Sequence, residues 1–140
     1  MNLSQLDNAI VAIIEKKKAL SKLSYDDKNY DKIEEELHNL EDDFVEKYGD
    51  YMEDVLQDIH DELCPDNDVL LPIAYFANNY QETGKNPDGS TIYDVDYKEG
   101  VFVDTDKYPG KDTRLVLLPN PVRVVLLVGG QKKEVVWKGK

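Results

Sequence analysis

The sequence is poor in cysteine and in long apolar segments. Cys64 is the one cysteine among 140 residues, so an internal disulfide is excluded and we expect the reducing environment of a cytoplasm. The longest apolar run, residues 9–14, is much shorter than the roughly 20 residues that cross a bilayer. The first residues also lack the basic stretch and apolar region of a signal peptide, so we predict neither export nor membrane insertion.

Catalytic and cofactor-binding motifs are equally scarce. The chain contains no Gly-x-Ser-x-Gly, no glycine-rich phosphate-binding loop and no dinucleotide-binding fingerprint. His38 and His60 lie 22 residues apart, a spacing that suits no zinc site, and are interpreted as surface residues. Cys64 follows a predicted helix and has acidic neighbours that disfavour the thiolate, so it is interpreted as an inert, partly buried thiol. We predict a protein that is not an enzyme and needs no cofactor or metal.

Four aspartates leave one enzymatic alternative open. Asp94, Asp96, Asp104 and Asp106 form two Asp-x-Asp pairs on neighbouring predicted strands, and the alternation of a strand places each pair on one face. Carboxylates gathered in this way bind hard cations such as Ca²⁺ or Mg²⁺. A metal-dependent enzyme that uses these aspartates is therefore kept as an alternative.

The N-terminal half predicts an antiparallel helical hairpin. Apolar residues recur every three or four positions over residues 3–20, which is typical of an amphipathic helix. A longer series of the same spacing covers residues 30–63, and Gly49 within it predicts a kink or short break. At ~1.5 Å per residue the second helix is roughly 20 Å longer than the first. Its uncovered stripe, Met52 to Leu63, must therefore pack on the sheet or form a homodimer contact.

The C-terminal half predicts an antiparallel β-meander of about five to six strands. Stretches rich in Val, Ile, Thr and Tyr are separated by short turns, which favours antiparallel neighbours; the clear candidates are 91–97, 101–105, 113–118, 122–128 and 134–138. The unbroken apolar runs 115–118 and 124–128 indicate central strands covered on both faces. Residues 69–82 fit either a helical face or a strand, and we favour the strand. The sequence thus predicts one α+β domain, residues 1–140, with a helical hairpin (1–64) packed on an antiparallel sheet (65–140).

The excess negative charge is confined to the helical half. Residues 1–68 contain 20 Asp or Glu and 7 Lys or Arg, whereas residues 69–140 contain 9 and 10. The two halves therefore carry net charges of −13 and +1. A surface this acidic repels nucleic-acid phosphates and accelerates association with a basic partner, so we expect no direct nucleic-acid binding. The plainer interpretation, a face that only keeps the helices in solution, stays open.

These observations predict an interaction protein, an adaptor or inhibitor, whose helical face binds a basic surface of a partner protein. Carboxylates supply the charge, and tyrosines supply contacts that are both apolar and polar. The candidate contact residues are Tyr25, Asp26, Asp27, Glu34, Glu41, Asp42, Tyr51 and Glu53. In a sharper form of this hypothesis, carboxylates on the second helix replace phosphates, and the protein inhibits a nucleic-acid-binding protein.

Overall fold

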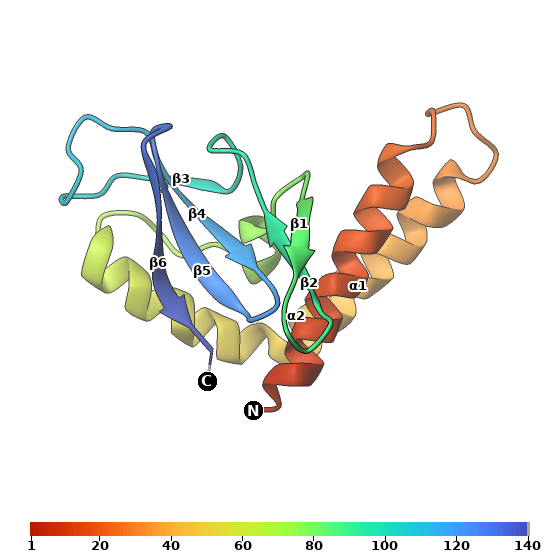
Figure 1. Cartoon of the computed structure of the whole chain (residues 1–140), viewed down its shortest axis with the longest axis horizontal. Coiled ribbons are helices and arrows are strands. Elements are labelled where there is room, and N and C mark those ends of the chain that lie inside the picture. Colours follow the sequence, from red (N-terminus) through yellow and green to blue (C-terminus); the bar gives the residue numbers. More distant parts are fainter. Residues whose placement is uncertain (140) are drawn as a thin grey trace.

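The computed structural model describes residues 1–139 and consists of two helices followed by a β region (Figure 1). Helices α1 (Leu3–Ser21) and α2 (Tyr30–Leu63) are antiparallel, and a 3-10 turn, η1 (Pro72–Tyr75), follows them. The strands are β1 (Gln81–Lys85), β2 (Thr91–Asp94), β3 (Val101–Val103), β4 (Thr113–Leu118), β5 (Arg123–Val128) and β6 (Lys132–Lys138). The predicted α+β class, with a short helix, a long helix and antiparallel strands, is confirmed.

Helix α1 packs along the N-terminal half of α2 through one apolar face. Asn2 caps α1, because its side-chain oxygen accepts a hydrogen bond from the backbone N–H of Gln5 at 3.0 Å. An ion pair between Lys16 and Glu36 (2.8 Å) links the two helices. The buried residues of α1 recur at the spacing of a helical face and are Leu6, Ile10, Ile13 and Ile14.

Helix α2 extends far beyond α1, and its C-terminal half lies under the larger sheet. Figure 1 shows the helix curving, with its first half beside α1 and its second half beneath β4, β5 and β6. Of the kink or short break predicted at Gly49, the break is wrong, since α2 is continuous from Tyr30 to Leu63. Within the predicted overhang, the residues buried inside the chain are Met52, Val55, Leu56, Ile59 and His60. The sequence left two packing partners open for this stripe, the chain's own sheet or a homodimer contact. The stripe packs inside the chain, so it gives no reason to propose a homodimer.

The six strands form two separate sheets instead of one continuous meander. Strands β1 and β2 pair as a hairpin, while β3-β4-β5-β6 follow sequence order in a four-stranded sheet, and all neighbours are antiparallel. Strands β4 and β5 are buried along almost their whole length, as their apolar runs predict. The predicted strands 91–97 and 101–105 end earlier, at Asp94 and Val103, and residues 95–100 connect the hairpin to the larger sheet.

Two contacts hold that connection against the larger sheet. Lys133 of β6 bonds both carboxylate oxygens of Asp94 at 3.0 Å, and its ammonium lies over the ring of Tyr97. Gly100 has a φ of 86°, and a Cβ at this position would lie 2.4 Å from the backbone oxygen of Leu115. Glycine is required here because both the left-handed backbone and the close approach to β4 exclude a side chain.

The strand favoured for residues 69–82 is wrong over most of its length. Pro72–Tyr75 is a 3-10 turn, and β1 begins only at Gln81. The cause is tertiary, because the hydroxyl of the buried Tyr75 contacts His60 of α2 at 2.8 Å and the N–H of Leu70 at 3.1 Å. These contacts attach the segment to the helix instead of to a neighbouring strand.

One hydrophobic core joins the helical and β regions. Buried residues of α1, α2, η1 and both sheets belong to a single cluster. Of the helices in the described residues, neither combines the length and apolar character needed to cross a membrane.

Candidate functional site

The solvent side of α2 carries a dense row of carboxylates. This helix of 34 residues contains fourteen Asp or Glu and two Lys, and its apolar stripe faces α1 and the sheet. Eight exposed acids between residues 42 and 61 define the acidic face: Asp42, Asp43, Glu46, Asp50, Glu53, Asp54, Asp58 and Asp61. At ~1.5 Å per residue the acidic face is about 28 Å long, with one carboxylate per ~4 Å. In Figure 1 the side of α2 away from the sheet is uncovered.

Few basic groups neutralise the acidic face. Within residues 1–139 the ion pairs of α2 are limited to Glu36 with Lys16, and Glu36 lies outside the face. Asp61 accepts a hydrogen bond from Gln57 at 2.8 Å, but this donor is neutral. Lys47 is the one lysine between residues 42 and 61. The face therefore projects a largely uncompensated negative potential into solvent.

The structure places two of the eight predicted contact residues, Asp42 and Glu53, on the acidic face. Glu34 and Glu41 are only half-exposed. Glu41 acts on Lys17 of α1, whose pKa is lowered by burial and held up in part by the Glu41 and Glu99 charges. The sequence spacing excluded both glutamates from the apolar stripe, but did not show that both side chains are only partly exposed.

Tyr51 was expected to be available to a partner and instead belongs to the fold. Its ring packs edge-on against Trp137 of β6, with the ring centroids 6.2 Å apart. The curvature of α2 brings this position onto the sheet, and the helical spacing alone could not reveal that contact. Tyr51 is therefore removed from the candidate interface.

Tyr25, Asp26 and Asp27 lie in the loop between the helices, away from the acidic face (Figure 1). The side chain of Tyr25 is 82% exposed, and its ring centroid lies 5.3 Å from that of Tyr30. Asp27 accepts a hydrogen bond from the N–H of Asn29 at 2.8 Å, while Asp26 is exposed. The loop thus presents one exposed aromatic ring beside an acidic side chain.

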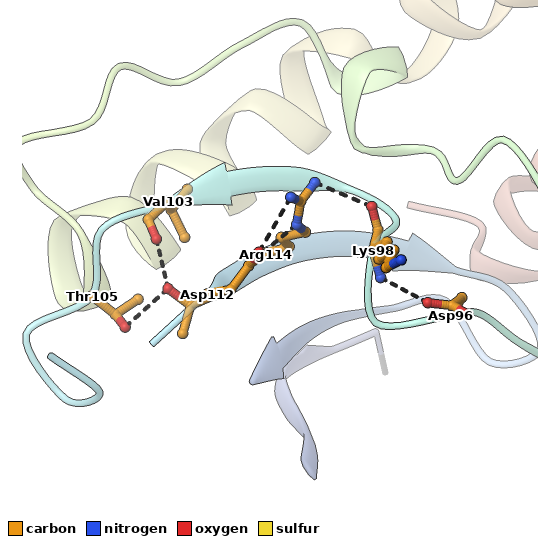
Figure 2. Close-up of polar contacts among 7 residues, drawn as sticks. Asp96, Lys98, Val103, Thr105, Asp112 and Arg114 are labelled. Atoms are coloured by element: carbon orange, nitrogen blue, oxygen red, sulfur yellow. Dashed lines mark hydrogen bonds and ion pairs between the residues drawn. The ribbon is translucent and has the colours of Figure 1, made fainter. Parts of the chain in front are cut away.

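The four sheet aspartates are not gathered at one place. Asp94 is paired with Lys133, and Asp96 accepts a hydrogen bond from the N–H of Lys98 at 3.0 Å (Figure 2). Asp104 and Asp106 are exposed in the connection that follows β3, in the other sheet. In the part of the chain that the structure describes, no three His, Cys, Asp or Glu side chains are grouped to hold a metal ion. The expected adjacency fails because β2 and β3 are not neighbouring strands.

Figure 2 shows the hydrogen bonds that join the residues around β3 and β4. Arg114 of β4 donates hydrogen bonds to the Asp112 carboxylate at 2.9 and 3.3 Å and to the backbone oxygen of Lys98 at 3.1 Å. The Thr113 hydroxyl donates to the backbone oxygen of Val103 at 2.6 Å. These contacts join the 95–100 connection and β3 to β4, so the polar residues here serve the fold.

The sequence analysis missed a buried polar network at the C-terminal end of α2. His60, interpreted as a surface residue, is 1% exposed, with Nδ1 3.0 Å from the backbone oxygen of Asn67 and Nε2 2.8 Å from the Tyr75 hydroxyl. Because a carbonyl oxygen only accepts, Nδ1 carries the proton and Nε2 accepts from Tyr75. Tyr75 in turn accepts from the N–H of Leu70 at 3.1 Å. The available signal was that His60 follows the apolar Leu56 by four residues, which places it on the apolar side.

Cys64 is a buried thiol, 1% exposed, at the end of α2. Burial, with a smaller contribution from the Asp104 charge, raises its pKa to about 11. A thiol in this setting is a poor nucleophile, in agreement with the interpretation from sequence.

Comparisons of the chain with protein-family models, with curated proteins and with solved structures found no match. The acidic face is the feature on which we base a function.

Proposed function

We propose that this protein is a non-enzymatic interaction protein, an adaptor or inhibitor, which binds a basic surface of a partner protein through the acidic face of α2. The observation that carries the proposal is the uncompensated row of eight exposed carboxylates with one lysine among them. Such a field accelerates encounter with an oppositely charged surface, and salt weakens it because the screening length is about 8 Å near 0.15 M.

The rigidity of the acidic face supports this role. The opposite side of the same helix segment is anchored in the core by the buried Met52, Val55, Leu56 and Ile59. The carboxylates therefore project from a backbone that is already ordered, so binding does not have to order the helix at that moment. Tyr25, with Asp26 and Asp27 beside it, remains a second candidate contact at the far end of the hairpin.

The charge spacing favours a second, narrower candidate, a nucleic-acid-mimicking inhibitor. One strand of duplex DNA carries one phosphate per ~3.4 Å of helix axis. The acidic face carries one carboxylate per ~4 Å of helix length on average. A protein that binds nucleic acid through a basic groove would then be the partner.

We further propose a reducing compartment such as a cytoplasm, since the lone Cys64 thiol is buried and unpaired within the described residues.

Charge reversal on the acidic face is the direct test. In the face variant, Asp42, Glu46, Asp50 and Glu53 are replaced by lysine. The matched control replaces Asp66, Asp68, Asp104 and Asp106, which are exposed acids outside α2, and so changes the net charge equally. Exposed substitutions of this kind usually change stability by at most about 0.5 kcal/mol each, and circular dichroism melts verify that both variants fold.

The measurement is the stopped-flow association rate with the partner purified from the native source, at low and at physiological salt. We expect the face variant to lose on the order of tenfold in rate at low salt, and the control to retain its rate. If both variants lost the same fraction of the association rate, the effect would come from net charge and not from the acidic face. If the face variant kept its association rate, the acidic face would serve only to keep the protein in solution. Competition by duplex DNA for the same partner separates the mimic from a general adaptor.

A further inference from the structure

A polar pocket of about 810 Å³ lies where the N-terminal end of α1 meets two turns of the β region. One turn joins β1 to β2 and the other joins β4 to β5, and Figure 1 shows both beside the first residues of α1. The polar side chains in its lining include Ser4, Asp7, Asn8, Asn86, Asp88 and Asn120. Three segments distant in sequence thus form one hollow.

Hydrogen bonds between these segments hold the pocket open. Asp7 Oδ1 accepts from the N–H of Asn120 at 2.9 Å, which joins α1 to the β4–β5 turn. Asn86 Nδ2 donates to the backbone oxygen of Asn120 at 2.9 Å and to the Ser90 hydroxyl at 3.0 Å, which joins the two turns. Because these contacts already exist in the unliganded chain, a ligand would meet a preformed site.

The lining offers negative charge and hydrogen-bond acceptors. No Lys, Arg or His side chain lines the pocket as described, whereas two carboxylates do. The Asp7 carboxylate accepts from the backbone N–H groups of Asn120 and Val122, whereas the exposed Asp88 is engaged by Ser90 through Oδ1 and retains Oδ2 for a ligand. Burial raises the pKa of Asp7, the Asn120 and Val122 N–H groups and the Arg123 charge oppose that rise, and the Asp88 charge adds a smaller contribution to it. A cation with several N–H donors would satisfy both carboxylates.

We propose that this pocket receives the guanidinium of an arginine side chain carried by a polypeptide partner. A guanidinium is always charged and presents five N–H donors in a plane, which matches two separate carboxylates and the neighbouring amide oxygens. The volume admits such a side chain with its adjoining backbone. A metal ion is a poorer match, since no three His, Cys, Asp or Glu side chains are grouped here or elsewhere in residues 1–139. The inference rests on the proposed function, in that the partner is basic, and adds the residue type that anchors it.

A second hollow shares one lining residue with the pocket and another with the acidic face. It has a volume of about 540 Å³, lies between α1 and α2, and is lined by Asn8, Leu40, Asp43 and Tyr48 among others. Asn8 also lines the first pocket, so the two hollows share one lining residue. Asp43 belongs to the acidic face. An extended segment of a partner held by that face would therefore pass Lys47 and Asn8 of the second hollow before it reached the arginine pocket.

The test uses the full ¹⁵N-labelled chain and a capped Gly-Arg-Gly peptide, with Gly-citrulline-Gly as the neutral counterpart of the same shape. We expect saturable shifts of the Asn8, Gly89 and Asn120 amide signals with arginine and none with citrulline. Asp88→Asn retains an oxygen to accept the hydrogen bonds from Ser90 and should weaken arginine binding about tenfold. Asp7→Asn, which retains the acceptor for Asn120, should have a similar effect.

The face variant described above serves as the matched control and should bind the singly charged peptide as the unmodified chain does. The pocket assignment is overturned if the shifts do not saturate, if citrulline produces the same shifts, or if Asp88→Asn leaves the affinity unchanged. Shifts confined to residues 42–61 would also overturn it while leaving the acidic face as the binding surface. The proposed function and the pocket assignment can fail separately. If arginine binds at the pocket but the face variant associates with the partner at an unchanged rate, the proposed function is refuted and the pocket assignment stands.

Discussion

Tyr75→Phe removes a single hydroxyl from the buried network around His60 and leaves the aromatic ring in place. The hydroxyl donates to His60 Nε2 at 2.8 Å and accepts from the N–H of Leu70 at 3.1 Å, in a residue that is fully buried. Without it, Nε2 has no donor in a site that excludes water. The Leu70 N–H is less affected because Leu70 is 44% exposed and water can replace the lost acceptor.

The expected cost follows from that difference. A buried acceptor without a partner costs about 1–3 kcal/mol, whereas a solvated N–H costs little, and no cavity forms because the ring is retained. We therefore expect Tyr75→Phe to lower the free energy of unfolding by about 2 kcal/mol. For a chain of this length, that corresponds to a fall in Tm of roughly 4–8 °C.

Urea unfolding followed by Trp137 fluorescence and by circular dichroism measures this change. Combining Tyr75→Phe with His60→Leu in a double-mutant cycle isolates the contact, and we expect a coupling of about 1–2 kcal/mol. Tyr25→Phe is the matched control, because that exposed residue should stay within about 0.5 kcal/mol of the unmodified chain. A coupling below about 0.3 kcal/mol would refute the assigned donor and acceptor roles.

The remaining predictions concern two glycines and the buried thiol. Gly49→Ala should raise the free energy of unfolding by about 0.5–1 kcal/mol, since glycine disfavours a helix interior and the added Cβ meets only Val45 Cγ1, at 3.4 Å. Gly100→Ala should lower the free energy of unfolding by more than about 2 kcal/mol, because φ is positive and the added Cβ would lie 2.4 Å from the backbone oxygen of Leu115. Thermal melts that rank the two variants in the opposite order would contradict both predictions. Cys64 should react with a chromogenic disulfide reagent at about pH 8 only after urea unfolds the chain, and fast reaction of the native protein would show that the thiol is accessible. Burial raises the pKa of Cys64 from 9.0 to about 11, so the thiol of the unfolded state loses its proton at a lower pH than the thiol of the folded state. The free energy of unfolding should therefore fall as pH rises from about 9 to about 11. The fall should be smaller in Cys64→Ala, which has no thiol.

The periodicity of apolar residues in the sequence was enough to locate the amphipathic helices, which bury one face, and the central strands, which bury both faces. The 3-4 spacing located α1 and α2, and the bounds of α2 agree with its apolar series at both ends. The apolar runs located β4 and β5, because a strand in the middle of a covered sheet has apolar residues on both sides. The position of the excess charge was also available from sequence, since most acids on the side of a helix opposite its apolar stripe face solvent.

Only the tertiary structure decided which side chains remain available. Glu34 and Glu41 are only partly exposed, Tyr51 packs on Trp137, and His60 is buried, although local spacing treated all four as open to solvent. The division into two sheets, the 3-10 turn at Pro72–Tyr75 and the polar pocket likewise depend on contacts between distant segments, such as Tyr75 with α2 and Asp7 with a backbone N–H 113 residues later. Local propensity carries no information about such partners, because the free energy of these contacts exists only once the chain has brought the two segments together.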